Sequence, residues 1–469
     1  MPPILAAFLT MAFVGYLFRR DIRQRPNVTA ALWLPFIWMF LIFSRAVSQW
    51  LGMFGVRLGG ISLEEGSPLD ATVYLVLICA GIYVLIRRGT RIQDVIHDNA
   101  WPLLFVFCCF IAIFWSDLPF VAFKRWIKIL GHPIMVLILL TEPVPVEAVE
   151  RLMKRCAYIV LPVSILFIKY YPQWGRRYTP WGASILSGIT TGKNLLGADC
   201  WVLGLFLFWY SWRIWRGKRD RHRRDELVLC VTLLAMLSWL LYRADSKTSI
   251  GCLILGIATI LILQRRFIDE KFIAIYVVAA IAIFAVAQTL FSVSDYVVAF
   301  LGRNSTLTGR TDLWKELLKI HTNPLIGVGF ESFWLGKTAQ QLQGHFFFIP
   351  NEAHNGYLEI YLNMGLFGLL VLAGVLVATF FKICSEFQRN LEWAQYRLAF
   401  FAAILLYNWT ESAFRSLHPV WFGFYLIAME YSGADFFFPQ ANSLRANGQY
   451  EPAFLATTAD DCSVTSRAI

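Results

Sequence analysis

A histidine stands at the point where a polar segment turns into a long apolar run. His354, Tyr357, Leu358, Tyr361 and Gly365 follow one another at three- or four-residue spacing. On a helix, this stripe would carry an imidazole at the mouth, two tyrosines below it and a small residue for close helix packing. Imidazole titrates near neutrality and can take a proton from a hydroxyl group. The histidine is therefore a candidate base, and the alternative is a helix cap or a lipid head-group contact.

Several basic residues lie in short segments that contain glycine, serine or threonine, at the ends of apolar runs. They are Arg176, Arg177, Lys193, Arg243, Lys247, Arg303 and Arg310. Guanidinium forks and helix N-termini both stabilise phosphate oxygens, so this set predicts a site for a diphosphate. The alternative is that these residues are ordinary charges that contact lipid head groups.

Together, the two features would suit the transfer of a sugar from a diphosphate carrier to a hydroxyl group. Breaking a sugar–diphosphate bond requires stabilisation of about two developing negative charges on the leaving group, and a base for the incoming hydroxyl. Metal-dependent glycosyltransferases commonly meet the first requirement with a divalent ion held by paired carboxylates. No Asp-x-Asp occurs in this chain. Clustered arginines would be the substitute, and His354 would be the base.

The composition indicates where such a site must be built. Of the 469 residues, 58% are hydrophobic and only 16% are charged, far outside the range of a water-soluble protein. At about 20 residues per spanning helix, this predicts an all-α polytopic membrane protein with about 12–13 transmembrane helices. Little is left for a separate soluble domain, so the chemistry must lie among helices and their loops.

Apolar runs bounded by charged or turn residues define these helices. The runs fall at roughly 3–18, 29–51, 71–86, 101–115, 127–141, 156–171, 195–212, 228–243, 249–264, 272–292, 356–381, 398–409 and 418–433. In the longest loop, 294–355, apolar and polar residues alternate at helical spacing over residues 311–321. This pattern predicts a short amphipathic helix over the bundle. We expect residues 1–433 to form the multispan domain and residues 434–469 a tail that is partly disordered.

Basic residues are divided unequally between the two sides of the predicted bundle. If alternate loops share a side, 25 Lys and Arg residues lie on one side and 16 on the other. The positive-inside rule then places the N-terminus and loop 294–355 outside and the tail inside. The net charge of +11 is thus a topology signal and does not indicate nucleic acid. None of the nine cysteines has metal-ligand spacing, so we expect neither a zinc site nor a disulfide framework.

Several short motifs, in this order, resemble the O-antigen ligase and polymerase superfamily of bacterial membrane proteins. The motifs are Thr191-Gly-Lys-Asn-Leu-Leu-Gly197, Gly309-Arg-Thr-Asp-Leu-Trp314, Asn323-Pro-Leu-Ile-Gly-Val-Gly329 and His354-Asn-Gly-Tyr-Leu358. Two more look most like the exopolysaccharide-polymerase branch. These are Trp115-Ser-Asp-Leu-Pro119, followed by Lys124-Arg125, and Asn408-Trp-Thr-Glu-Ser412. The similarity runs from about residue 100 to residue 430.

The resemblance implies an inverting, metal-independent glycosyltransferase without a cofactor, acting on the periplasmic face of the bacterial inner membrane. It would transfer glycan from an undecaprenyl-diphosphate-linked oligosaccharide to a glycan acceptor, and polymerisation is favoured over ligation. Membrane lipids and other polysaccharide-assembly proteins would be its further partners.

The resemblance also assigns roles to individual residues. Arg310 matches the family's loop arginine, and His354 matches the histidine assigned as base or acceptor-orienting group. Lys193 and Asn194 match a His-Lys-Asn element whose histidine is Gly192 here. Either Arg176 or Arg177 would stand for the family's earlier-loop arginine. The expected diphosphate-binding residues are thus Arg176 or Arg177, with Lys193, Lys247 and Arg303, and the expected supporting residues are Asn194, Asn355, Tyr357, Tyr361 and Glu411.

Two other functions stay open from the sequence. A flippase or exporter for the same glycan would also need a cationic, aromatic-rich cavity, together with internal two-fold repeats that the sequence does not clearly show. A metal-dependent glycosyltransferase could use Glu64, Glu65 and Asp70 of the first outer loop. Sensitivity to a chelator would separate this enzyme from one that relies on arginines.

Overall fold

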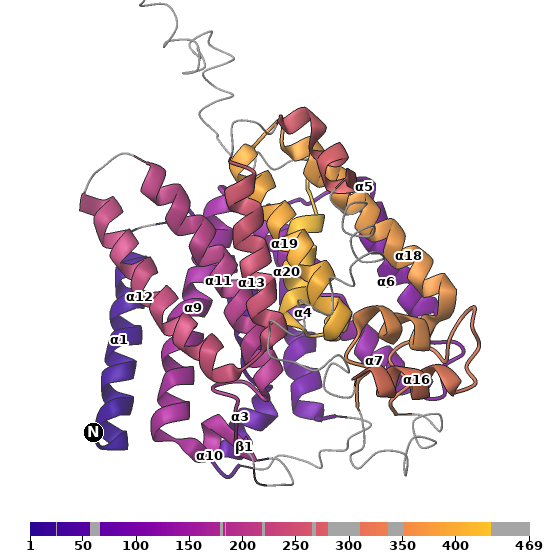
Figure 1. Ribbon diagram of the computed structural model, residues 1–469, viewed down its shortest axis with the longest axis horizontal. Helices are drawn as coiled ribbons and strands as arrows, with labels where there is room; N and C mark the ends of the chain where they lie inside the picture. The colour runs from indigo at the N-terminus through magenta and orange to yellow at the C-terminus, as the bar shows by residue number, and fades with distance from the viewer. Residues whose placement is uncertain are drawn as a thin grey trace, which may run out of the picture.

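The protein is a bundle of long helices, with a small two-stranded hairpin at one end (Figure 1). The computed structural model describes residues 1–24, 26–56, 66–178, 182, 184–217, 221–264, 269–279, 310–335 and 351–432. The predicted tail 434–469 and most of the predicted run 272–292 lie outside the described residues.

The N-terminal part of the chain, up to residue 186, is mostly helical and ends in the hairpin. Its elements are α1 (Pro3–Arg23), the 3₁₀ turn η1 (Ala30–Leu32), α2 (Trp33–Phe43), α3 (Val47–Met53), α4 (Pro68–Arg87), α5 (Ile92–Asp98), α6 (Ala100–Ile111), α7 (Pro119–Ile129), α8 (Gly131–Leu140), α9 (Pro145–Tyr170), α10 (Pro172–Gly175), β1 (Arg176–Tyr178) and β2 (Ser184–Leu186). The strands β1 and β2 pair antiparallel, with Arg176 opposite Leu186.

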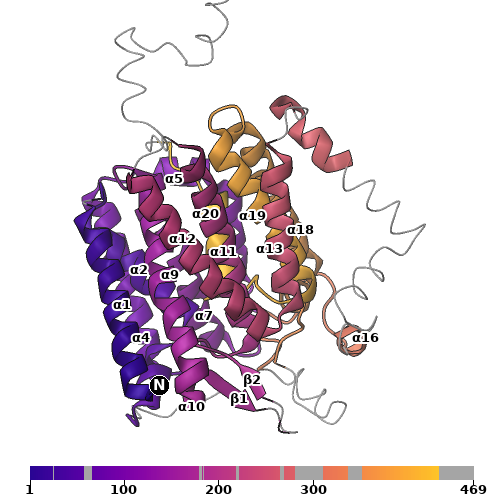
Figure 2. The same ribbon diagram turned by 60° about the vertical axis from the view of Figure 1, so that its left-hand side comes forward.

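The second half completes the bundle. Its elements are α11 (Lys193–Arg216), α12 (Arg221–Ala244), α13 (Lys247–Ile262), the 3₁₀ turn η2 (Glu270–Phe272), α16 (Arg310–Lys319), α18 (Gly356–Glu386), α19 (Leu391–Thr410) and α20 (Pro419–Ala428). Helix α11 lies at the centre against α9, α12, α13 and α20. In Figure 2, α1 forms one edge of the bundle and α18 the other.

The fold confirms the prediction of an all-α polytopic membrane protein. In the described part of the chain, five helices are long and apolar enough to cross a membrane, or up to seven if each sharply bent pair is one span. Helices satisfy their own backbone hydrogen bonds, which is why apolar runs of this length adopt them in lipid.

Two of the predicted runs are interrupted, and a sharp bend precedes a third. The run 29–51 bends by 61° between α2 and α3, and a 95° bend between α5 and α6 lies just before the run 101–115. The run 127–141 is divided at Leu130 into α7 and α8. Arg45 lies at the break before α3, where its guanidinium group donates to the carbonyl oxygens of Trp174 and Thr190.

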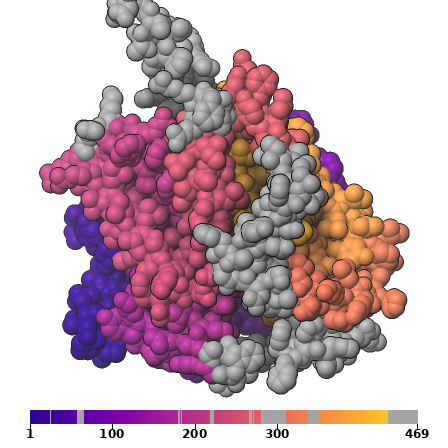
Figure 3. All heavy atoms as spheres, viewed as in Figure 1, coloured from indigo at the N-terminus to yellow at the C-terminus, as the bar shows by residue number. Residues whose placement is uncertain are grey.

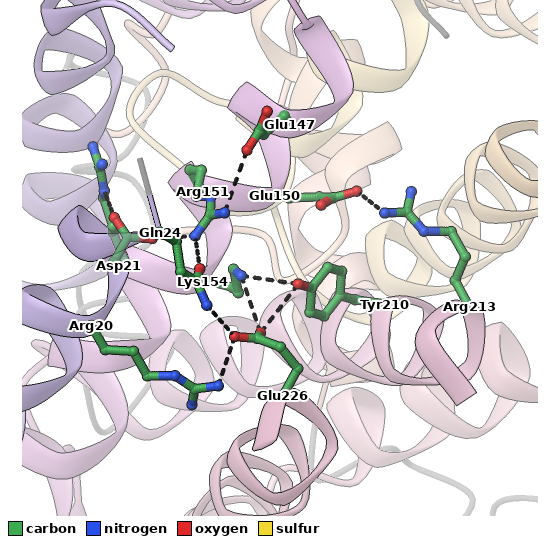
Figure 4. A network of polar contacts seen from close by, with 11 residues as sticks. Arg20, Asp21, Gln24, Glu147, Glu150, Arg151, Lys154, Tyr210, Arg213 and Glu226 are labelled. Carbon is green, nitrogen blue, oxygen red and sulfur yellow. Dashed lines mark hydrogen bonds and ion pairs between the residues drawn. The ribbon is translucent and has the colours of Figure 1, made fainter. Parts of the chain in front are cut away.

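Buried ion pairs tie helices together at the end of the bundle away from α10 and α16. Arg20 binds Glu226 at 2.8 Å, and Arg151 and Arg155 both bind Asp21, at 2.9 and 2.8 Å. Figure 4 shows the contacts of Arg20 and Arg151 together with those of Gln24, Glu147, Glu150, Lys154, Tyr210 and Arg213. Many basic residues that we read as topology signals therefore also neutralise acidic side chains.

A loop segment inserts into α18 and breaks it. The N–H groups of Leu366 and Phe367 bind the carbonyl oxygens of Pro324 and Leu325, and a Cβ on Gly365 would lie 2.3 Å from the Leu325 backbone. Gly365 itself is left-handed at φ 64°. Its predicted role in close helix packing was therefore wrong, since the close partner is a loop.

The predicted amphipathic helix is present as α16. Leu313 and Leu317 are buried in a small second core with Phe333, Ala353 and Leu362. Trp314 donates to the carbonyl oxygen of Ala353 at 2.8 Å. Figure 3 shows the segment around α16 at the lower right of this face of the molecule. The helix thus connects the loop to the residues just before α18.

Candidate active site

A tight turn after α19 presents Glu411 at the end of the bundle that carries α10 and α16. The Oδ1 atom of Asn408 accepts hydrogen bonds from the N–H groups of Ala413 and Phe414, at 2.9 and 3.2 Å. Asn408 is fully buried, so this fold-back of the chain is enclosed by the bundle. The predicted Asn408-Trp-Thr-Glu-Ser412 motif is therefore a scaffold for its own glutamate.

The start of α18 docks directly on this turn. The N–H of Gly356 donates to the carbonyl oxygen of Glu411 at 3.0 Å, and the N–H of Asn355 donates to Ser412 Oγ at 3.1 Å. The side chain of Asn355 caps α18 by accepting from the N–H groups of Tyr357 and Leu358. His354 is consequently held beside Glu411 by the backbone of the two residues that follow it.

Arg310, the first residue of α16, reaches the same glutamate. Its Nη2 lies 2.7 Å from Glu411 Oε1, and its Nη1 donates to the carbonyl oxygen of Thr410. The guanidinium group is almost enclosed, with 9% of the side chain exposed. The two residues are 101 positions apart, and the structure brings them together as an ion pair.

His354 is positioned by two carboxylates. Its Nδ1 lies 3.1 Å from Glu352 Oε1 and 3.4 Å from Glu411 Oε2. An Nδ1–H that donates to these oxygens leaves Nε2 as the acceptor, which is the tautomer that a base requires. The residue is left-handed at φ 49°, an uncommon conformation for a residue with a side chain. The ring is 27% exposed and is thus accessible to a substrate.

Sequence reasoning missed Glu352 and Arg415. Glu352 Oε2 lies 2.7 Å from Arg415 Nη1, while its other oxygen faces His354. Both residues lie close in sequence to residues that we did select, His354 and Glu411. That proximity was the available signal, but nothing in the spacing indicates that the two segments meet.

Three further predicted residues lie around the cluster. Asn194 donates to Glu411 Oε2 at 3.1 Å, and the preceding Lys193 is the first residue of α11. Lys247 is the first residue of α13 and pairs with the exposed Asp245 at 3.2 Å. The hydroxyl groups of Thr248 and Thr410 are 2.7 Å apart, so α13 also begins beside the turn. The N-termini of α11, α13, α16 and α18 therefore converge here.

The remaining predicted residues lie elsewhere or serve the scaffold. Arg176 donates from Nε and Nη2 to the carbonyl oxygen of Ile168, whereas Arg177 is exposed and lines a groove beside α10. Tyr357 donates to the carbonyl oxygen of Leu405 at 3.2 Å, a contact between α18 and α19. Tyr361 is half-buried one turn further along α18. Arg303 lies outside the described residues.

The charges of the cluster are arranged to keep Glu411 ionised. Burial by itself would raise the pKa of Glu411, but the hydrogen bond with His354 and the charge of Arg310 outweigh it and hold that pKa below its ordinary value. Arg310 and Arg415 balance Glu411 and Glu352. Lys247 is itself balanced by Asp245, so Lys193 gives the mouth of the site its positive surplus for an anionic substrate.

Glu352, His354 and Glu411 could also hold a metal ion, because their ligand atoms all lie within 4.8 Å of one another. However, each carboxylate already binds an arginine, at 2.7 Å in both cases. A divalent cation would have to displace these ion pairs and lie next to two guanidinium groups. The donor set therefore fits a hydrogen-bonded cluster better than a metal site.

The chain is similar to known proteins in two respects. Residues 231–373 match the family described as O-antigen ligase. The matched segment includes Arg310, Glu352 and His354, and it ends before Glu411. The chain is also 30% identical over 359 residues to the exopolysaccharide production protein ExoQ of Rhizobium meliloti (strain 1021), covering 72% of this chain and 75% of that protein.

Proposed function

Because this chain belongs to the O-antigen ligase and ExoQ-like family, we propose that it is an inverting glycosyltransferase that polymerises a glycan carried on undecaprenyl diphosphate. The observation that carries this proposal is the cluster in which Glu411 binds both Arg310 and His354. It combines a positioned base with a cation. We place the reaction on the periplasmic face of the inner membrane, in a multispan domain of residues 1–433 with a cytoplasmic tail 434–469.

Each residue of the cluster then has a separate task. Nε2 of His354 takes the proton from the acceptor hydroxyl as that oxygen attacks the anomeric carbon, and the bond to the diphosphate breaks. Arg310, Lys193 and Lys247 bind the diphosphate and stabilise its developing charge, helped by the helix N-termini that surround it. Glu411 and Glu352 hold the imidazole in the required tautomer. Asn194 fixes the second oxygen of Glu411.

The alternative to a mechanism based on arginines is a metal-dependent glycosyltransferase that uses carboxylates of the first outer loop. Of its sequence candidates, Glu64 and Glu65 lie outside the described residues, and Asp70 accepts hydrogen bonds from the N–H and hydroxyl of Ser48 at 2.8 and 2.5 Å. Asp70 is thus engaged in joining α3 to α4.

We expect the purified protein to elongate lipid-linked glycan at full rate in excess chelator, since arginine and lysine neutralise the leaving group. The measurement is the chain-length distribution of the product with and without chelator. A control with added Mg²⁺ and Mn²⁺ should give the same rate. If the chelator stopped polymer formation and one of these ions restored it, the enzyme would be metal-dependent. Glu352, His354 and Glu411 would then be the proposed metal ligands.

Arg310→Lys should lose about 1–3 kcal/mol of transition-state stabilisation. Lysine keeps the positive charge but lacks the two-pronged guanidinium group that reaches both Thr410 and Glu411. Arg310→Ala should reduce it further. The exposed Lys315 on the same helix supplies a control, since Lys315→Ala should have little effect. Normal activity of the Ala variant at normal expression would remove Arg310 from the mechanism.

The proposed sidedness can be tested with single cysteines in a variant that lacks the native ones. His321 is exposed after α16, and Arg216 is exposed at the end of α11. We expect an impermeant thiol reagent to label His321→Cys in intact cells, and Arg216→Cys only after lysis. The reverse pattern would place the cluster on the cytoplasmic side and exclude a periplasmic reaction.

A further inference from the structure

A groove of about 440 Å³ opens at the end of the bundle that also carries the catalytic cluster, and it is built from other elements. Its lining includes Gln49 and Met53 of α3, Gln173 and Trp174 of α10, Arg177 of β1, and Thr191 just before α11. Both views of the fold place α10 and β1 at the same end of the bundle as α16 (Figures 1 and 2). The groove thus faces the same side as His354.

The groove lies at a break in a candidate spanning segment. The chain bends by 61° between α2 and α3, and Arg45 at the bend donates to the carbonyl oxygens of Trp174 and Thr190 at 2.5 and 2.9 Å. Irregular backbone at membrane depth is tolerated where it is buried in protein or lines a polar cavity, and broken helices often mark binding sites. Arg45 therefore builds the groove, while its neighbours supply the surface that a ligand would meet.

The lining has the chemistry of hydroxyl recognition. The amides of Gln49 and Gln173 each donate and accept hydrogen bonds, as sugar hydroxyls do, and Arg177 and Thr191 add further donors. The described residues that line the groove include no carboxylate. Trp174 is held rigidly by Tyr171, whose ring is stacked on it at 5.2 Å. Rigid aromatic groups beside a few polar side chains are typical of pockets that bind small ligands.

A short stretch of chain joins the groove to the cluster. Thr191 precedes Asn194 by three residues, which span at most about 11 Å, and Asn194 binds Glu411. A transfer reaction needs two substrates, and the proposed function already places the donor's diphosphate among Arg310, Lys193 and Lys247. In an inverting displacement, the acceptor must approach from the side opposite the leaving group.

We infer that this groove binds the acceptor glycan, through the hydroxyl groups of the sugars next to the one that reacts. The inference rests on the proposed function and extends it. It assigns Arg177, which we had expected to bind the donor's diphosphate, to the acceptor instead. Gln49 and Gln173 become determinants of acceptor specificity that are separate from the catalytic cluster.

The test compares the wild type with Gln49→Ala, Gln173→Ala and the double variant, all as full-length protein. The donor is the lipid-diphosphate-linked repeat unit, and the acceptor is the delipidated repeat-unit oligosaccharide. Loss of both amides should raise the KM for the acceptor about tenfold or more, because each neutral hydrogen bond contributes a few-fold to binding. The KM for the donor and kcat at saturating acceptor should not change. Gln388→Ala, exposed beyond α18, is the matched control.

An unchanged acceptor KM in the double variant, or a change confined to the donor KM, would overturn the inference. Equilibrium binding of the oligosaccharide, measured without donor, separates this failure from a failure of the proposed function. If the wild type makes no product but binds the oligosaccharide, and the double variant does not bind it, the groove is a glycan site and the proposed reaction is wrong. If the wild type does not bind the oligosaccharide at all, the inference is wrong.

Discussion

Replacing His354 by alanine should abolish polymer formation in cells and lower the rate of the purified protein by about 10²- to 10⁴-fold, the usual contribution of a positioned base. Binding of the lipid-linked donor should persist, since the cations around the diphosphate remain. The wild-type rate should also fall in acid, because a protonated imidazole cannot accept the proton of the acceptor hydroxyl. The measurement is the initial rate across pH with donor and acceptor both saturating.

His321→Ala is the matched control for this experiment, because His321 is exposed at the end of α16 and makes no part of the cluster. It should keep the wild-type rate and the wild-type pH profile. If His354→Ala itself turned over at the wild-type rate, the histidine would be a structural residue at the start of α18. Its left-handed conformation would then reflect the turn rather than catalysis.

Glu411→Gln should have an effect of similar size, for a different reason. Glutamine keeps the shape of the side chain but removes the charge that faces both Arg310 and His354. Breaking one partner of a buried ion pair costs about 3–5 kcal/mol, so the variant should unfold at a lower temperature. Activity should fall by about 10²-fold or more, because arginine and imidazole both lose their orientation. Thermal unfolding and initial rates measured on the same preparation give both quantities.

The pH dependence of stability provides a second readout for Glu411. Because its pKa is lower in the folded protein than in the unfolded chain, its contribution is present above the ordinary pKa of glutamate and is lost as the pH falls through the lowered value. The Glu411→Gln variant should lack the loss of folding stability that the protonation of Glu411 causes in the wild type. Glu316→Gln, which removes an exposed pair with Lys319, should leave the acid profile and the activity unchanged. An acid profile of Glu411→Gln that matched the wild type would contradict the assigned electrostatics.

Much of the architecture follows from local features of the sequence. Long apolar runs had to become helices, since only internal hydrogen bonding satisfies a backbone in lipid. The alternation in 311–321 was enough to predict α16, because burial of Leu313 and Leu317 on one face requires that spacing. The choice of His354, Arg310 and Glu411 as site residues came from chemistry and family resemblance. The structure brings all three into one cluster, and their roles stay a prediction.

What the tertiary structure decided were the contacts between segments distant in the chain. Asn194 and Glu411 are 217 positions apart, and the pairing of Glu352 with both His354 and Arg415 depends on how α18 docks on the turn after α19. The same holds for the break at Gly365 and for the different surroundings of Arg176 and Arg177. Periodicity along a helix reports only which face is apolar. Which polar groups meet across helices is set by the packing of the whole bundle, where burial makes each unpaired charge costly and so selects its partner.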